Sequence, residues 1–513
     1  MLGIDINLWD FYENSARCWP NKKVIGLGDQ SYTYVDFRKR VEHLSSYLSS
    51  ENMEFQENVV VLSPNSIQFV QVMLANVRMG LITELINWRL APERLCDLLN
   101  ISTAKIVFFS LKCIDAYDYL RKNLSREVKY VCMDGYADGA VSWAEIEGMS
   151  LEYCPRRYTR DSDMVVQIYS SGTTSMPKAM LHSMKNFSTK AIISAVSAEW
   201  SSDEIYLLTS PLFHISCVGM FACFLAGATC IIGDPSTDGL IHAIQFDRAT
   251  RIGVVPTTLN RLLDYTEAHP EFDHSSIRYI EYGTAPMTPE QISKVMKFFN
   301  CRLIQYYGMT ETAAHIALLL PEHHLDERKR KSVGLPVLGT EIRIVQRDGS
   351  ECRTGEPGEI IVRHPCTIDS YLNNPELTKE TLVGEWYYTG DIGYLDDEGF
   401  LFLVDRKKDM IISGGENIYP KEIVTCILSM GDEIIDVAVA GVPDDVYGEA
   451  VMAVVVKAND SAITKDDITE YCKAHLASYK KPRFVYFVDK LPLNDMGKIN
   501  RTAVKAIHLS QVK

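Results

Sequence analysis

The sequence lacks several features that mark whole classes of protein. Its 513 residues carry a formal net charge of -15, so neither nucleic acid nor an anionic membrane is expected as the main partner. Its thirteen cysteines form no Cys-x-x-Cys pair and no spacing suited to zinc. That pattern predicts buried, reduced thiols in a cytosolic protein and excludes a disulfide framework. Internal repeats, low-complexity tracts and long charge runs are also missing.

Hydrophobic runs of membrane-spanning length are missing as well. The most apolar stretch, residues 217–233, is broken by three glycines, and we expect a buried helix followed by a strand there, with no integral membrane segment. The first nine residues include Asp5 and no basic flank, so a signal peptide is not expected. These observations predict a cytoplasmic protein.

The length and the alternation of patterns predict an α/β protein of at least two domains. A chain of 513 residues exceeds what one core usually serves. Up to about Leu403, apolar strands such as residues 59–62 alternate with helical patterns such as residues 66–79, which favours parallel sheets covered on both faces. A change of composition near residues 405–409 then begins a smaller α+β unit. We predict a large multi-sheet N-terminal domain, residues 1–405, and a small C-terminal lid domain, residues 406–513.

Residues 169–178 carry the most informative motif, Tyr-Ser-Ser-Gly-Thr-Thr-Ser-Met-Pro-Lys, directly after an apolar strand. Small hydroxylated residues around Gly172 allow backbone amides, hydroxyl groups and the Lys178 ammonium to converge on an anion. The loop differs from the Gly-x-x-x-x-Gly-Lys-Ser/Thr nucleotide loop, because Pro177 stands in place of the second glycine. A polyphosphate site is therefore predicted, with an ordinary polar surface loop as the alternative.

A second motif, Tyr-Gly-Met-Thr-Glu at residues 307–311, follows an apolar strand at residues 302–304. An aromatic ring, a glycine, a hydroxyl and a carboxylate at a strand end suit a nucleotide site. Mg²⁺ needs oxygen ligands, and the phosphates of the substrate usually supply several of them, so a single protein carboxylate is enough to hold the ion. The alternative is a plain strand-to-helix turn.

Taken in order along the chain, these motifs resemble those of the adenylate-forming superfamily, in its acyl-CoA synthetase branch. Further matches are Gly-Thr-Ala-Pro at 283–286, Tyr-Thr-Gly-Asp at 388–391, Asp-Arg-Lys-Lys-Asp at 405–409 and the segment 491–498. The resemblance extends from near Pro20 to near Val504. This chain departs from the family at Ser170, Ser175 and Ala179 of the phosphate loop, and Thr284 replaces a glycine.

The resemblance implies a role for each matching residue. ATP phosphates would be held by Ser170, Ser171, Gly172, Thr173, Thr174 and Lys178, adenine by Gly283, Thr284, Ala285, Pro286 and Tyr307, the α-phosphate by Thr310, Mg²⁺ by Glu311, and ribose by Asp391 and Arg406. Lys498 would be the catalytic lysine, because a preplaced ammonium offsets the charge that develops on the transferring phosphoryl group. Lys408 would be the hinge of the lid.

The thiol acceptor is also implied by resemblance. Coenzyme A would contact Arg89, Gly414, Gly415, Tyr447, Lys481 and Arg483, although Lys481 and Arg483 fit equally well as solvated surface charges. His214 would gate the passage between the acyl pocket and the CoA tunnel. Residues 213–216 lack the aspartate with which amino-acid-activating relatives pair an amino group, so a free carboxylic acid is expected. Tyr282 suggests a shallow pocket for a short or medium acid.

The resemblance thus implies ATP-dependent conversion of a carboxylic acid to acyl-AMP, followed by thioester formation with coenzyme A, and a requirement for ATP and Mg²⁺. Three alternatives stay open. A stand-alone ligase would load the phosphopantetheine arm of a carrier protein. A non-catalytic relative would bind a nucleotide as a sensor. A luciferase would need oxygen chemistry, which no residue here signals.

Overall fold

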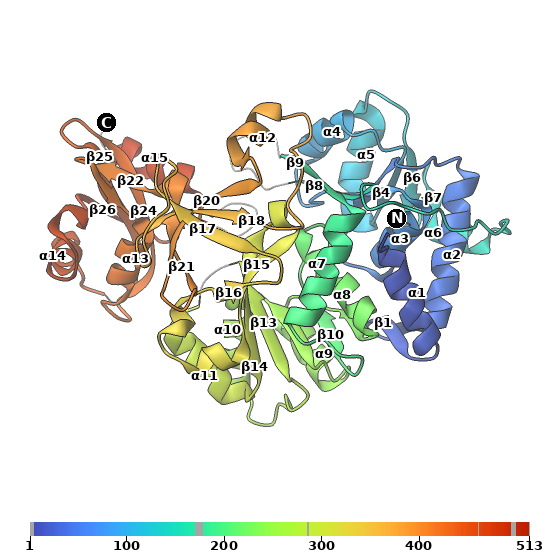
Figure 1. The fold of residues 1–513 in the computed structure, drawn as a ribbon, viewed down its shortest axis with the longest axis horizontal. Coiled ribbons are helices and arrows are strands. Elements are labelled where there is room, and N and C mark those ends of the chain that lie inside the picture. Colours follow the sequence, from blue (N-terminus) through green and yellow to red (C-terminus); the bar gives the residue numbers. More distant parts are fainter. Residues whose placement is uncertain (1–4, 170–177, 285–286, 460, 494–498, 512–513) are drawn as a thin grey trace. The chain divides into compact units, whose positions relative to one another are not determined.

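The structure is a computed structural model that describes residues 5–169, 178–284, 287–459, 461–493 and 499–511 (Figure 1). The chain forms two compact units. The first holds the described residues up to Glu341 together with Arg363–Glu385, and the second holds Ile342–Val362 together with the described residues from Trp386 onward. The chain therefore passes between the two units more than once.

The first unit contains a seven-stranded sheet with the order β7-β6-β5-β3-β4-β8-β9. Its strands are β3 (Asn58–Leu62), β4 (Ile82–Leu85), β5 (Ile106–Phe109), β6 (Lys129–Cys132), β7 (Val141–Ser142), β8 (Met164–Tyr169) and β9 (Ala179–Ser183). All neighbours are parallel except β8 and β9, which are antiparallel. Strand β3 is buried along its whole length, as expected for a parallel sheet covered on both faces.

A nine-stranded sheet of the same unit has the order β16-β15-β14-β13-β12-β10-β11-β1-β2. Its strands are β1 (Lys23–Leu27), β2 (Gln30–Thr33), β10 (Ile205–Leu208), β11 (Thr229–Ile232), β12 (Arg251–Val254), β13 (Tyr279–Gly283), β14 (Arg302–Met309), β15 (Ala314–Leu319) and β16 (Leu335–Pro336). The strands between β1 and β14 are parallel, and antiparallel neighbours close both ends. The carboxyl ends of β10, β12, β13 and β14 therefore meet at one edge.

Helices cover both sheets of the first unit. They are α1 (Leu8–Cys18), α2 (Tyr34–Ser50), α3 (Ile67–Met79), α4 (Pro92–Ile101), α5 (Ile114–Asn123), α6 (Trp143–Gly148), α7 (Met184–Ser197), α8 (Val218–Ala226), α9 (Thr237–Gln245), α10 (Pro256–Ala268), α11 (Pro289–Phe299) and α12 (Pro375–Thr381). Short 3-10 turns are η1 (Leu111–Cys113), η2 (Ile215–Cys217), η3 (Thr310–Thr312), η4 (Pro321–Leu325) and η5 (Lys329–Lys331), and a short strand β19 (Leu382–Val383) follows α12.

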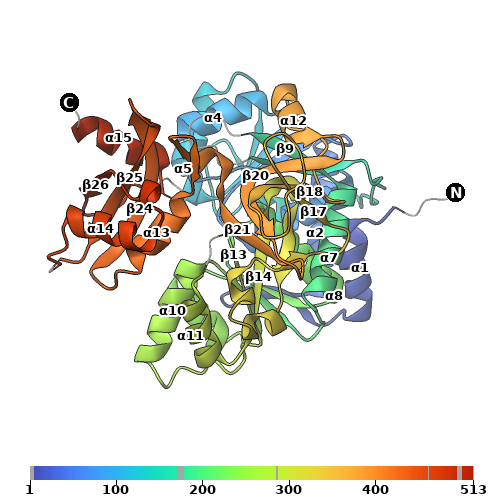
Figure 2. The same cartoon turned by 60° about the vertical axis from the view of Figure 1, so that its left-hand side comes forward.

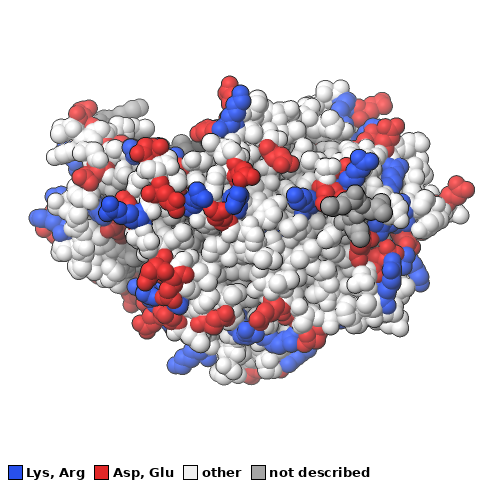
Figure 3. All heavy atoms as spheres, viewed as in Figure 1, with Lys and Arg blue, Asp and Glu red and all other residues white. Residues whose placement is uncertain are grey.

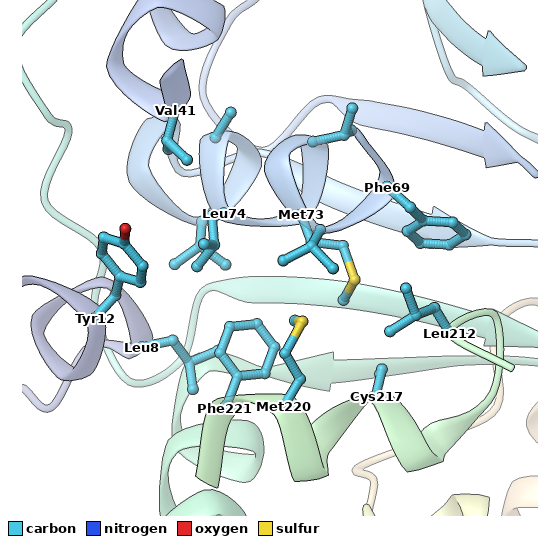
Figure 4. Packing of buried hydrophobic residues seen from close by; sticks show 14 of the residues in the cluster. Leu8, Tyr12, Val41, Phe69, Met73, Leu74, Leu212, Cys217, Met220 and Phe221 are labelled. Atoms are coloured by element: carbon cyan, nitrogen blue, oxygen red, sulfur yellow. The ribbon is translucent and has the colours of Figure 1, made fainter. Parts of the chain in front are cut away.

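The main core of this unit lies between α3 and α8 (Figure 4). Met73 and Leu74 of α3 point toward Met220 and Phe221 of α8, and all four are buried. Helix α3 begins where Ser66 accepts a hydrogen bond from the Phe69 amide at 3.0 Å and ends at a left-handed glycine, so local capping fixes both ends.

A second core lies on the opposite face of the nine-stranded sheet. Helices α10 and α11 lie against β13 and β14 in both views (Figures 1 and 2), and Leu262 and Ile292 pack there with Ile280 and Leu303. Because successive strand residues point to opposite faces, Tyr282 shares this side, while Glu281 and Gly283 face the other.

The second unit contains two smaller sheets. One comprises β17 (Glu341–Val345), β18 (Gly358–Arg363), β20 (Trp386–Leu395) and β21 (Leu401–Arg406); the other comprises β22 (Ile411–Ser413), β23 (Glu416–Ile418), β24 (Ile434–Asp444), β25 (Gly448–Lys457) and β26 (Phe484–Phe487). Its helices are α13 (Pro420–Leu428), α14 (Lys465–His475) and α15 (Arg501–Gln511), with 3-10 turns η6 (Lys407–Asp409) and η7 (Ser478–Lys480).

The predicted α/β class, with a small α+β portion near the C-terminus, is confirmed. The expected helix and strand in residues 217–233 are also confirmed as α8 and β11. Two expectations were wrong. Residues 307–309 continue strand β14, because they pair with antiparallel β15. Strands β18 and β20, and β20 and β21, form antiparallel pairs where alternation predicted parallel ones.

The surface carries both signs of charge. Figure 3 shows acidic and basic side chains interspersed over one face, and ion pairs such as Arg38 with Glu42 at 3.1 Å account for part of this mixture. Within the described ranges, no helix combines the length and the apolar character needed to cross a lipid bilayer.

Candidate active site

The two strands on either side of the predicted phosphate-binding residues are hydrogen-bonded to each other. Tyr169, the last residue of β8, pairs with Ala179 of β9. Lys178 precedes this pair, and its ammonium lies 5.7 Å from the centre of the Tyr371 ring. The predicted phosphate-binding residues Ser170, Ser171, Gly172, Thr173 and Thr174 lie outside the described residues, so their role stays a prediction.

A buried carboxyl group contacts the last residue of β8. The Tyr169 hydroxyl donates to Glu84 Oε1 at 2.5 Å, and Ser102 donates to Glu84 Oε2 at 2.6 Å. Burial raises the pKa of Glu84, because its hydrogen bonds only partly offset the loss of solvent. Glu84 therefore anchors Tyr169, which directly precedes the predicted phosphate-binding residues.

The Tyr-Gly-Met-Thr-Glu motif runs from strand β14 into η3. Tyr307 is buried, and Gly308 lies so close to β15 that a Cβ atom there would stand 2.0 Å from the Ala314 carbonyl oxygen. Because the two backbones come this close, only glycine can be accommodated at position 308. Thr310 and Glu311 follow in the 3-10 turn at the carboxyl edge of the sheet.

The segment that begins at Arg363 brings the two motifs together, and no pattern in the sequence marks it. The Tyr371 hydroxyl donates to Glu311 Oε1 at 2.9 Å, and the Leu372 amide donates to the Ala179 carbonyl at 2.9 Å. Tyr371 thus touches the predicted Mg²⁺ carboxylate and lies beside the predicted phosphate-binding Lys178. No motif surrounds Tyr371, and only the fold identifies it.

A histidine that the sequence analysis did not single out lies beside this group. His182 on β9 is fully buried, with its ring 5.4 Å from that of Phe187, and it faces the Thr310 backbone. Burial lowers the pKa of His182 to about 3. Its imidazole is therefore neutral near pH 7 and adds no positive charge to the predicted phosphate site.

The predicted adenine loop is described in part. Gly283 ends strand β13, and Thr284 has a φ of 65°, an unusual value for a β-branched residue. Ala285 and Pro286 lie outside the described residues. Tyr282 donates to Gln305 at 3.2 Å on the face covered by α10 and α11, so its side chain points away from the Gly283 side.

Arg89 and His214 gather around one aromatic ring. The Phe213 ring lies 4.5 Å from the half-buried His214 ring, and the Arg89 guanidinium lies 5.8 Å from the Phe213 ring centre. The predicted gate and one predicted CoA contact are therefore neighbours within the first unit.

The predicted ribose contacts pair with each other in the second unit. Asp391 of β20 lies opposite Arg406 of β21, and the two side chains approach to 3.4 Å. Lys408 lies in η6 and is exposed; its role as a hinge stays a prediction.

Four of the predicted CoA residues also lie together in the second unit. The Gly414 amide donates to the Tyr447 carbonyl at 2.9 Å, Gly415 follows with a φ of 87°, and the Arg483 guanidinium lies 5.8 Å from the Tyr447 ring centre. Lys481 is half-buried after η7. Lys498 lies outside the described residues, between Leu493 and Ile499, which form an antiparallel bridge.

We expect Asp391→Asn to raise the KM for ATP about tenfold or more, because a hydrogen bond to a charged group contributes about 1.5–3 kcal/mol. Steady-state kinetics with ATP as the varied substrate would measure this change. Asp397→Asn, at an exposed position in the following turn, is the matched control and should leave the KM unchanged. An equal KM in both variants would contradict the ribose assignment of Asp391.

Comparison with known proteins places these motifs in a family. Residues 12–372 match the model of the AMP-binding enzyme family, and residues 426–498 match that of the AMP-binding enzyme C-terminal domain. The chain is 30% identical over 494 residues to a 2-succinylbenzoate–CoA ligase of Bacillus licheniformis, covering 96% of this chain and 98% of that protein. It is 31% identical over 509 residues to an indoleacetate–CoA ligase of Aromatoleum aromaticum, covering 98% of each.

Solved structures agree with this placement. The o-succinylbenzoate CoA synthetase of Bacillus subtilis, in complex with its acyl-adenylate intermediate, superposes with a TM-score of 0.86 at 28% identity over 98% of this chain and 99% of that one. A structure of that synthetase with ATP and magnesium ion gives a TM-score of 0.85 at 28% identity, over 97% and 99% of the two chains.

Proposed function

Because the chain belongs to the AMP-binding enzyme family, we propose that it is an ATP-dependent acid–CoA ligase that forms AMP. The observation that carries this proposal is the meeting of Lys178, Tyr371 and Glu311 at one edge of the sheet. An ammonium beside a carboxylate held by a phenol suits a bound triphosphate and its Mg²⁺, since the cations and the phosphates neutralise each other.

In the first step the carboxylate of the acid attacks the α-phosphorus of ATP, and pyrophosphate leaves. Glu311 would hold Mg²⁺, which supplies charge neutralisation on the phosphates when bound. Lys178 would bind the phosphates, Tyr307 the adenine, and Asp391 with Arg406 the ribose. Lys498 would offset the charge that develops on the transferring phosphoryl group.

In the second step the thiol of coenzyme A attacks the acyl carbonyl carbon, and AMP leaves. Gly414, Gly415, Tyr447 and Arg483 would line the path of the pantetheine arm, with His214 at the acyl end. Arg483 is already paired with Asp444 at 2.6 Å, so a CoA phosphate would compete with that carboxylate. A movement of the C-terminal residues about Lys408 would withdraw Lys498 after the first step and bring the residues that line the path of the CoA thiol into place for the second step.

All thirteen cysteines are free, which fits a protein that works in the reducing cytosol, where ATP and CoA are also available.

Pyrophosphate release tests the proposal. Purified protein with ATP, Mg²⁺ and a panel of carboxylic acids should release pyrophosphate, and addition of free CoA should convert the acyl-AMP to a CoA thioester detectable by mass spectrometry. Thioester formed only on a carrier protein would favour the carrier-loading alternative. Nucleotide binding without pyrophosphate release from any acid would contradict a ligase and favour a sensor.

A further inference from the structure

The turn between β14 and β15, which carries Thr310 and Glu311, contains two consecutive residues with unusual backbone angles. Ala313 has a φ of 51° and Ala314 has a φ of 102°. Such values favour glycine, because a Cβ atom crowds the neighbouring backbone there. Strained residues of this kind persist only where surrounding contacts hold them, and they cluster at functional sites. The turn is therefore held in a conformation that it would not adopt by itself.

One of the contacts that hold the turn comes from inside it. Thr312 is fully buried, and its hydroxyl donates to the Met309 carbonyl at 3.2 Å and to the Ala314 carbonyl at 2.8 Å. The hydroxyl carries a single proton, which these two acceptors share. Met309 ends β14 and Ala314 begins β15, so Thr312 ties the two strands together across the turn.

A second contact comes from helix α7. Lys190 is fully buried, and its ammonium donates to the carbonyl oxygen of His315, the residue that follows Ala314. Within the described ranges, no carboxylate forms an ion pair with Lys190. A buried cation without a counter-ion is costly, and an apolar side chain would fill the same space without that cost. The position of Lys190 therefore favours a role for its N–H donors.

The hydrogen bond from Lys190 does not depend on its charge. Burial lowers the pKa of Lys190 to about 7, because the charged form loses its solvation. A neutral amine still carries N–H bonds and can donate to the same carbonyl. The contact with His315 is therefore available on both sides of neutral pH.

Glu311 itself is held through its backbone and its side chain. The Ile368 amide donates to the Glu311 carbonyl at 2.9 Å, and the Tyr371 hydroxyl donates to Glu311 Oε1 at 2.9 Å. Both donors come from the segment that begins at Arg363. The turn and this segment together fix the direction in which the carboxylate of Glu311 points.

We propose, on the basis of the ligase function proposed above, that Lys190 and Thr312 are positioning residues, which hold the strained turn so that Glu311 presents its carboxylate to the Mg²⁺ ion of bound ATP. They act through the backbone of the turn, Lys190 from the β15 side and Thr312 across it. Mg²⁺ demands near-ideal octahedral geometry, so a small displacement of this carboxylate weakens the metal-dependent part of ATP binding.

The dependence of ATP affinity on Mg²⁺ tests this role in the intact protein. Titration calorimetry gives the Kd for ATP with Mg²⁺ and with EDTA, for the wild type and for two variants. Thr312→Val removes the hydroxyl and keeps the volume, and Lys190→Met removes the donor and keeps an unbranched chain. Each should raise the Kd for ATP with Mg²⁺ about tenfold, the effect of a carboxylate displaced by a fraction of an ångström, and change the Kd in EDTA less than about threefold.

Two matched controls separate positioning from a general loss of stability. Thr266 on α10 is also buried, and its hydroxyl donates to the Leu262 carbonyl at 2.8 Å, so Thr266→Val removes an equivalent hydrogen bond elsewhere. Lys185→Met replaces an exposed lysine on the same helix as Lys190. Both controls should leave the two Kd values unchanged. Thermal melting verifies that every variant is folded, and Thr312→Val decides the matter if Lys190→Met is not.

A second measurement uses the reaction. With saturating ATP and the acid that the wild type turns over fastest, the Mg²⁺ concentration for half-maximal pyrophosphate release should rise about tenfold in both variants. Thioester formation from supplied acyl-AMP and CoA should stay within about threefold of the wild type, because that step involves no phosphoryl transfer.

The outcomes distinguish this proposal from the ligase. Equal losses of ATP affinity with Mg²⁺ and with EDTA, or no loss in Thr312→Val, would overturn the positioning role while pyrophosphate release upholds the ligase. A wild-type protein whose ATP affinity does not depend on Mg²⁺ would also overturn it. Metal-dependent ATP binding that weakens as expected, without pyrophosphate release from any acid, would overturn the ligase and leave the positioning role standing.

Discussion

Lys498→Ala should lower the rate of acyl-AMP formation by about 10²–10³-fold, the typical loss when one preplaced stabilising group is removed from a transition state. The same variant should convert supplied acyl-AMP and CoA to thioester at a rate within about threefold of the wild type, because the second step uses no phosphoryl transfer. Pyrophosphate exchange measures the first half-reaction, and thioester formation from synthetic acyl-AMP measures the second.

Lys490→Ala provides the matched control, because Lys490 is an exposed lysine shortly before the same segment. It should leave both half-reactions unchanged. If Lys498→Ala instead reduced both half-reactions equally, the lysine would not be specific to the adenylation step, and a lid that exchanges two active conformations would lose its support.

Arg251→Met should lower the free energy of unfolding by about 3–5 kcal/mol, the usual cost of removing one partner from a buried ion pair. Arg251 is fully buried, and its loss leaves Glu204 and Glu281 without their shared cation. Burial already raises the pKa of Glu204, so this carboxylate gains little compensation from solvent. Urea denaturation followed by circular dichroism would measure the change.

Arg248→Met is the control for this variant. Arg248 pairs with Asp273 at 2.6 Å, but both side chains are about half exposed, and surface pairs contribute about 0–1 kcal/mol. A loss for Arg251→Met no larger than that for Arg248→Met would show that the buried group contributes little to stability. Adding Glu204→Gln to Arg251→Met should recover part of the loss, because it removes one of the two unpaired charges.

The sequence predicted those parts of the fold and the site that depend on local patterns. Helix α3 is readable from its apolar spacing and its capping Ser66, and the motif at residues 307–311 was found where the structure places an edge of the sheet. The continuation of β14 through Met309 was not readable, because it depends on pairing with β15 rather than on composition.

Contacts between distant segments could not be predicted from the sequence for the same reason: they depend on tertiary pairing. Tyr371 meets Glu311 across 60 residues of chain, and Glu84 meets Tyr169 across 85. Each pair is brought together by the tertiary arrangement of the strands, and no sequence motif links one partner to the other. The buried polar group of Arg251, Glu281 and Tyr306 likewise combines three strands, β12, β13 and β14, and each of its members would be taken for an ordinary strand residue from the sequence alone.

The route of the chain through the second unit guides the design of chimeras. A graft that exchanges residues 406–513 with a relative would carry the sheet of β22 to β26 whole, while the recipient would keep β17, β18, β20 and nearly all of β21. Several polar contacts cross that seam, among them the Lys421 amide, which donates to Asp405 Oδ2 at 2.8 Å, the Lys407 ammonium, which donates to Glu359 at 2.7 Å, and Arg347, which donates to Asn417 at 3.1 Å. A chimera that keeps Asp405 opposite the first helix of the grafted segment, and keeps a residue pair equivalent to Arg347 and Asn417, should fold. A chimera that lacks these pairs would leave polar groups at the junction without their partners.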